Sequence, residues 1–138
     1  MSIGHFQHVA DANRAWEETV KSPVTEVLAD LMSEPPNMLR FALKSRVGKS
    51  LDDVAVGELC SLSTRIADPG YGDALRKETE NIFTELKEFR GFLGGVVAQL
   101  MDVDEEVLGL AFWADKPAFD ASLPKNSMYR IDLYHRVL

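Results

Sequence analysis

The sequence predicts an α+β domain of the ferredoxin-like type, preceded by an extension of helices and one strand. The element order that predicts it, from residue 54 onward, is strand, helix, strand, strand, helix, strand. Three patterns carry this order: an amphipathic helix at 73–89, two apolar strands within 96–113, and a short helix followed by an aromatic strand within 116–138. Two helices and four strands in this order form the split β-α-β arrangement.

The extension is predicted to span residues 1–50, and the domain residues 51–138. Apolar residues recur at helical spacing over 11–32, but Pro23 interrupts the pattern, so we expect two short helices rather than one. Two consecutive prolines end this helical region, because they favour extended backbone in the residues before them. A strand is therefore expected over residues 38–47.

The expected strand at 38–47 resembles the expected last strand at 128–137, with five identical residues in ten aligned positions. One interpretation is a repeat, which makes the chain one and a half modules long. The other is chance, because short strands have a biased composition. If the repeat is real, the extra strand either extends the sheet or contacts a partner subunit, and the sequence leaves that choice open.

The elements of the domain follow from apolar periodicity and from turn residues. The strand at 107–113 is apolar on both faces, so helices are expected on one side of the sheet and a second sheet on the other. Pro117 suits the first turn of a helix, which begins there. The expected ranges are a strand at 54–64, a helix at 73–89, strands at 96–101 and 107–113, a helix at 116–123 and a strand at 128–138.

Charge and composition narrow the classes of partner. A chain of 138 residues with formal net charge -7 repels nucleic-acid phosphates and anionic membranes, so neither is an expected partner. No apolar stretch reaches the ~18 to 20 residues of a membrane helix, and the first residues lack the pattern of a secretory signal. The single Cys60 cannot form an internal disulfide. A soluble cytoplasmic protein is expected.

No cofactor is expected. The sequence has no phosphate-binding loop, no dinucleotide-binding glycine pattern, no cysteine cluster and no serine nucleophile motif. His5 and His8 have a spacing that invites a metal interpretation, but on a strand they point to opposite faces, and no third ligand is apparent. We therefore predict no metal site.

Several short segments resemble the antibiotic biosynthesis monooxygenase-like superfamily of dimeric α+β barrels. They are the helix-to-strand turn at 89–95, Trp113 at a strand end, the helical segment 116–122 and the aromatic last strand. The resemblance covers about 85 residues, Val54 to Leu138. It implies a homodimer, with a pocket for a flat apolar molecule between sheet and helices of each subunit. Reactions in the superfamily are diverse, so the fold does not select one.

Two residues of the last strand are the candidate catalytic groups. Tyr129, Leu133 and His135 share one face of a strand, and this face is expected to meet the helices. A neutral imidazole at His135 can accept a proton there, and the phenol of Tyr129 can donate a hydrogen bond to an oxyanion. The alternative is that both side chains only pack in the core or at its rim.

Four further residues are candidates for substrate binding. Trp113 can stack on an aromatic molecule or simply anchor the following helix. Asn81 lies beside the apolar stripe of the long helix, where its amide either reaches the pocket or stays in solvent. Phe83 and Phe112 are candidate lining residues. If Phe83, Phe112 and Trp113 fill the space themselves, their role is structural.

The favoured hypothesis is a cofactor-independent tailoring enzyme of the oxygenase, cyclase or decarboxylase type. Its substrate is an aromatic or polyketide-like small molecule, whose anion forms in a dry pocket. The rival hypothesis is a non-catalytic dimeric protein, small-molecule-binding or stress-associated, that uses the same pocket.

Overall fold

The computed structural model describes residues 4–34, 39–123 and 131–135. The chain forms two units, one up to Met38 and one from Leu39 onward. The first contains two helices, α1 (Val9–Val20) and α2 (Pro23–Leu31). The expected interruption at Pro23 is confirmed: α2 begins there, and the Ser22 side chain caps it by accepting from the backbone N–H of Val24 at 3.3 Å. Neither helix contains a buried residue.

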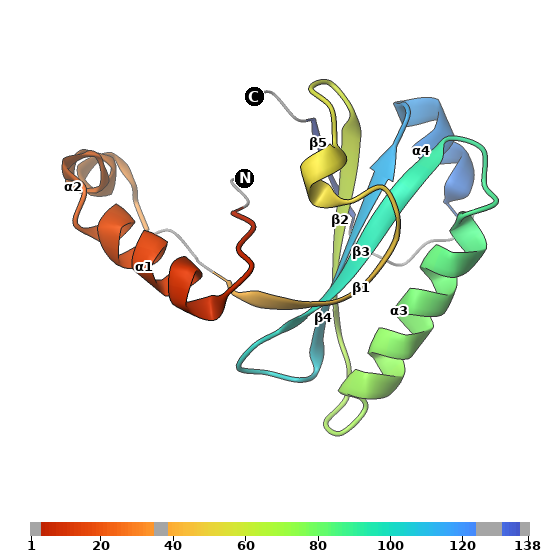
Figure 1. The fold of residues 1–138 in the computed structure, drawn as a ribbon, viewed down its shortest axis with the longest axis horizontal. Helices are drawn as coiled ribbons and strands as arrows, with labels where there is room; N and C mark the ends of the chain where they lie inside the picture. The colour runs from red at the N-terminus through yellow and green to blue at the C-terminus, as the bar shows by residue number, and fades with distance from the viewer. Residues whose placement is uncertain (1–3, 35–38, 124–130, 136–138) are drawn as a thin grey trace. The chain divides into compact units, whose positions relative to one another are not determined.

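The second unit is one antiparallel five-stranded sheet with two helices on one face (Figure 1). The strand order is β1-β3-β4-β2-β5, and the last four of these have the order of a ferredoxin-like sheet. The fold class predicted from the sequence is therefore confirmed. The elements are β1 (Phe41–Gly48), the 3-10 helix η1 (Leu51–Asp53), β2 (Leu59–Ile66), α3 (Gly72–Leu86), β3 (Phe92–Leu100), β4 (Glu106–Trp113), α4 (Lys116–Ser122) and β5 (Asp132–His135).

Strand β1 settles a choice that the sequence left open. It pairs antiparallel with β3, from Phe41 opposite Leu100 to Gly48 opposite Gly94, and so extends the sheet of its own chain. The unit that contains it begins at Leu39, whereas the sequence placed the start of the domain at residue 51. The difference arises because pairing between distant strands is not visible in local periodicity.

Two strand boundaries differ from the expected ones. Strand β2 begins at Leu59 rather than at Val54, which instead follows η1 and is 5% exposed in the core. Strand β3 begins at Phe92, so two glycines expected to lie in a turn belong to the strand. A Cβ at Gly95 would lie 2.8 Å from the Phe83 ring. Glycine there keeps the helix close to the sheet.

The sheet has a helix-covered face and a helix-free face. Helices α3 and α4 cover the first, where the apolar cluster includes Val97, Val107, Trp113 and Phe119 (Figure 1). On the second, η1 and the residue after it pack on a smaller cluster around Phe112, which is fully buried. Because successive residues of a strand point to opposite faces, β4 contributes to both clusters. Within the described residues, no second sheet covers the helix-free face.

Candidate functional site

A surface pocket of about 310 Å³ lies beside the C-terminal half of α3. Its described lining consists of three apolar and two acidic side chains: Ile82, Leu86, Phe89, Glu85 and Glu88. The three apolar residues also belong to the cluster on the helix-covered face. The described lining comes from α3 and the turn after it and includes no strand residue, whereas the sequence predicted a pocket between sheet and helices.

Trp113 is buried and packs on one of the pocket residues, Phe89. Its indole Nε1 donates to the hydroxyl of Ser61 at 2.9 Å, and the residue is 2% exposed. Its ring packs edge-on against Phe89, Phe92 and Phe119, with centroid distances of 6.5, 5.4 and 5.7 Å. Trp113 thus contacts Phe89, which lines the pocket, but is itself buried.

Register places His135 level with this aromatic group. His135 lies opposite Leu59 in the β2–β5 pair, Leu59 lies opposite Trp113 in the β2–β4 pair, and Trp113 lies opposite Phe92 in the β3–β4 pair. Leu59 packs in the helix-side cluster, as does Leu133, two residues before His135. Strand alternation thus keeps the prediction that position 135 belongs to the helix-covered face.

The other candidate catalytic residue, Tyr129, lies outside the described residues. Ile131 and Leu133 are the described members of its expected strand face, and both pack in the helix-side cluster. The predicted orientation of the last strand is confirmed for these two residues.

The remaining substrate-binding candidates are not brought together. Phe83 is 4% exposed and packs on Phe92 beneath α3, with centroids 6.2 Å apart. Phe112 is fully buried, but in the cluster on the opposite face of the sheet. Asn81 is exposed, and its amide donates to the Glu78 carboxylate at 3.4 Å. Among the candidates whose side chains the structure describes, Trp113 and Phe83 pack together on the helix-covered face, and Phe112 and Asn81 do not join them.

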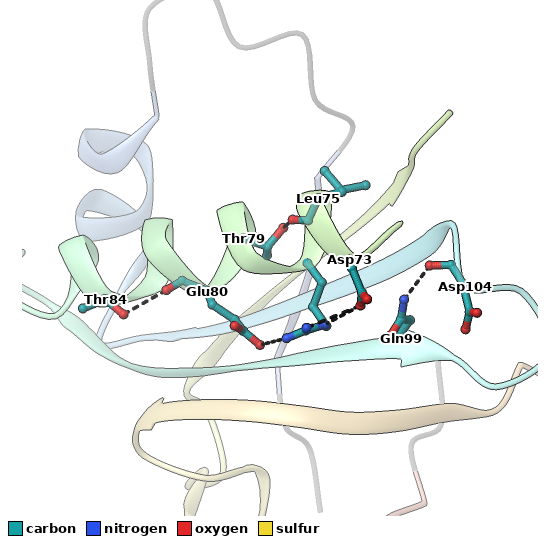
Figure 2. Close-up of polar contacts among 8 residues, drawn as sticks. Asp73, Leu75, Thr79, Glu80, Thr84, Gln99 and Asp104 are labelled. Atoms are coloured by element: carbon teal, nitrogen blue, oxygen red, sulfur yellow. Dashed lines mark hydrogen bonds and ion pairs between the residues drawn. The ribbon is translucent and has the colours of Figure 1, made fainter. Parts of the chain in front are cut away.

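Polar residues beneath α3 were missed by the sequence-based prediction. Arg65 on β2 donates to the hydroxyl of Thr79 at 3.0 Å, and that hydroxyl donates to the carbonyl of Leu75 at 2.9 Å. Across the sheet, the Gln99 amide donates to the carbonyl of Asp104 in the β3–β4 turn (Figure 2). Thr79 and Gln99 are 1% and 4% exposed. The alternation of polar Ser61, Ser63 and Arg65 with other residues along β2 is the sequence signal that could have revealed them.

Three titratable groups near the sheet have shifted pKa values, and their surroundings suit structural roles more than catalytic ones. Burial raises the pKa of the Cys60 thiol to about 11, so this cysteine is a weak nucleophile. The hydrogen bond from Lys49, followed by that from the backbone of Ala55, holds the pKa of Glu58 below its usual value. The side-chain and backbone hydrogen bonds from Ser50 likewise lower the pKa of Asp53. The last two carboxylates fix the loop around η1.

The described residues hold no group of three or more His, Cys, Asp or Glu side chains arranged to bind a metal ion. His5 and His8 do not lie on a strand, because His8 is the N-cap residue of α1. Its first turn follows at once, so strand alternation does not apply to this pair. None of the helices in the described ranges is long and apolar enough to cross a membrane.

Solved structures with similar folds identify the architecture. A monooxygenase-like protein of Listeria innocua superposes with a TM-score of 0.54 at 13% identity, covering 78% of this chain and 68% of that one. A ferredoxin-fold protein of Listeria monocytogenes, described as related to antibiotic biosynthesis monooxygenases, gives 0.56 at 12% identity, covering 76% and 69%. The chain has their fold.

A third protein of this kind is longer. It comes from Fusobacterium nucleatum and is described as a candidate monooxygenase, with a TM-score of 0.57 and 10% identity over 80% of this chain. The chain spans about half of that protein, 52% of its length. No protein-family model and no curated protein matches the sequence. At these identities the similarity establishes the ferredoxin-like fold alone, and function is argued from the site.

Proposed function

We propose that this protein binds an aromatic or polyketide-like small molecule in the pocket beside α3 and transforms it without a cofactor. The reaction is of the oxygenase, cyclase or decarboxylase type. The observation that supports the proposal is a pocket lined by Phe89, whose ring packs on Trp113, the residue that strand register aligns with His135. An apolar pocket with a few convergent polar groups is the usual form of a small-molecule site.

The chemistry begins with a proton transfer. His135 takes the proton of a phenol or enol, and Tyr129 donates a hydrogen bond to the oxygen that becomes negative. The substrate anion then either reacts with molecular oxygen, closes a ring, or releases carbon dioxide if it carries a carboxyl group. Each route uses reactivity that belongs to the substrate, so the protein supplies binding, a base and an oxyanion donor.

A homodimer is part of the proposal. The helix-free face exposes large apolar side chains at its open end, with Leu43 53% exposed and Ile66 76% exposed. A partner sheet over this face would bury them. The superfamily that the sequence resembles consists of dimeric α+β barrels, which supports the same arrangement here.

Mass spectrometry of small molecules that co-purify with the full chain tests the proposal directly. We expect a flat, mostly apolar compound, displaced when Phe89 is changed to Asp. With that compound as substrate, His135→Ala and Tyr129→Phe should each lower turnover by about 10²-fold or more. Unchanged turnover in both variants would discard the catalytic assignment.

One observation favours the rival function, a non-catalytic dimeric binding or stress-associated protein. Phe83 and Trp113 pack in the core rather than face an open cavity, so two of the expected aromatic walls are occupied by the fold itself. Binding of a co-purifying compound that stays chemically unchanged on incubation with the protein in air would support this second function.

A further inference from the structure

The described wall of the pocket beside α3 carries negative charge. Two aliphatic side chains and one aromatic ring form its apolar part, and the two remaining described lining residues, Glu85 and Glu88, are acidic. No basic side chain is among the described lining residues. An anionic ligand would therefore approach two carboxylates with no countercharge from the described wall.

The two pocket carboxylates, Glu85 and Glu88, differ in their side-chain partners from the acidic residues of α3 outside the pocket. Asp73 and Glu80 both pair with Arg76, and Glu78 accepts a hydrogen bond from Asn81. Among the described residues, Glu85 and Glu88 have no side-chain hydrogen bond or ion pair. These three carboxylates thus have side-chain partners within α3, whereas those of Glu85 and Glu88 are left to interact with a ligand.

The helix itself adds to this negative potential. The last turn of α3, which ends at Leu86, contains no basic residue. Carbonyl groups at a helix C-terminus carry a partial negative charge of about half an elementary charge. Acidic residues at this end are therefore unfavourable for the helix. Lys87 is the C-cap residue, but it does not line the pocket.

We propose that the pocket selects an aromatic molecule that bears a cationic nitrogen, such as a protonated amine. Its ring packs on Phe89, and its nitrogen lies near the carboxylates of Glu85 and Glu88. An ammonium group is attracted both by carboxylates and by the face of an aromatic ring. This inference rests on the proposed function, because it names the substrate class of the same pocket.

Three probes of one shape and different charge test the inference: 1-naphthylmethylammonium, 1-naphthalenemethanol and 1-naphthoate. Each is titrated into the ¹⁵N-labelled full chain at low salt, and the dissociation constant is taken from the shifts of α3 amide signals. We expect the cation to bind about two- to fivefold more tightly than the neutral alcohol, as for exposed charge pairs. The anion should bind most weakly.

Variants assign the preference to the two carboxylates. Glu85→Gln with Glu88→Gln should abolish the advantage of the cation and leave the neutral probe unchanged. Glu78→Gln, on the same helix but outside the pocket, is the matched control and should keep the advantage. High salt should reduce it in the unmodified protein.

The outcomes separate this inference from the proposed function. Two results would refute the charge selection but keep the pocket, provided that the neutral alcohol shifts the α3 amide signals. In the first, the cation binds no more tightly than the alcohol. In the second, it binds more tightly even to the double variant. If no probe binds near Phe89, both the selection and the pocket are overturned.

Discussion

The two faces of the sheet have similarly apolar sequences but differ in how completely they are covered. On the helix-covered face, Val97 and Val107 are 1% and 0% exposed, and the buried Thr79 hydroxyl and Trp113 indole N–H both donate hydrogen bonds. On the helix-free face, Phe112 is fully buried at one end, whereas Ile66 is 76% exposed at the other. The chain thus completes the core on the helix-covered face by itself and covers only part of the core on the helix-free face.

A short loop makes the difference within the helix-free face. Leu51 and Val54, in and just after η1, pack on the cluster around Phe112. Lys49 holds this loop by donating to both carboxylate oxygens of Glu58 at 2.6 and 2.7 Å. Leu43 and Ile66 are not part of this cluster and stay 53% and 76% exposed, so they are the side chains that the proposed second chain would cover.

The helix-covered face should be the most sensitive to truncation. Phe83→Ala removes a 4%-exposed ring beneath α3 and should lower the free energy of unfolding by about 3 to 5 kcal/mol. Urea denaturation monitored by circular dichroism measures this. Tyr71→Ala is the control: Tyr71 is 66% exposed, so its loss should cost within about 0.5 kcal/mol. Equal losses in the two variants would mean that this face is not a packed core.

Ser61→Ala tests the polar part of the same face. It removes the acceptor of the buried Trp113 Nε1–H, which has no access to water, so we expect a loss of about 1 to 3 kcal/mol. Ser63→Ala is the matched change one position along the same strand face. Its hydroxyl only donates to the carbonyl of Gly109 at 3.4 Å, so its loss should be smaller. The reverse order of the two losses, measured by urea denaturation, would contradict the assigned hydrogen bond.

The sequence predicted the covered face better than the open one. Apolar spacing in α3, a tolerated proline in α4 and the continuous apolar run of β4 are local signals, and all three elements formed where expected. Strand β1 formed too, but its place beside β3 depends on contacts between residues about fifty positions apart. No local pattern contains such a pairing.

The candidate site was predicted only in part for the same reason. Alternation along the last strand correctly assigned Ile131 and Leu133 to the helix side. It could not show that Phe112 belongs to the other face, because β4 is apolar on both sides. The pocket residues Glu85 and Phe89 are separated from one another by a single helical turn, yet only the packed structure shows a cavity between them and their neighbours.

A mutation on the exposed part of the helix-free face should weaken dimer association and leave the folding of the monomer unchanged. Ile66→Lys places a charge among the exposed apolar side chains, opposite Glu106 on β4, so the monomer should stay folded. We expect the dimer dissociation constant to rise at least tenfold, about 1.4 kcal/mol. Analytical ultracentrifugation measures it, with Tyr71→Lys as the control at another exposed site. A monomeric unmodified protein at every concentration would refute the proposed dimer.

The smallest effect should come from the loop that separates the covered and open ends of the helix-free face. Because hydrogen bonds lower the pKa of Glu58 in the folded protein, its stabilising effect is present above its unfolded pKa near 4.5 and is lost as the pH falls through the lower folded value. Glu58→Gln should therefore cost at most about 1 kcal/mol at pH 7, and the variant and the unmodified protein should converge in acid. Asp120→Gln changes an exposed pair on α4 and should shift stability less. A stability gap that stays constant with pH would show that the Lys49–Glu58 pair does not hold the loop.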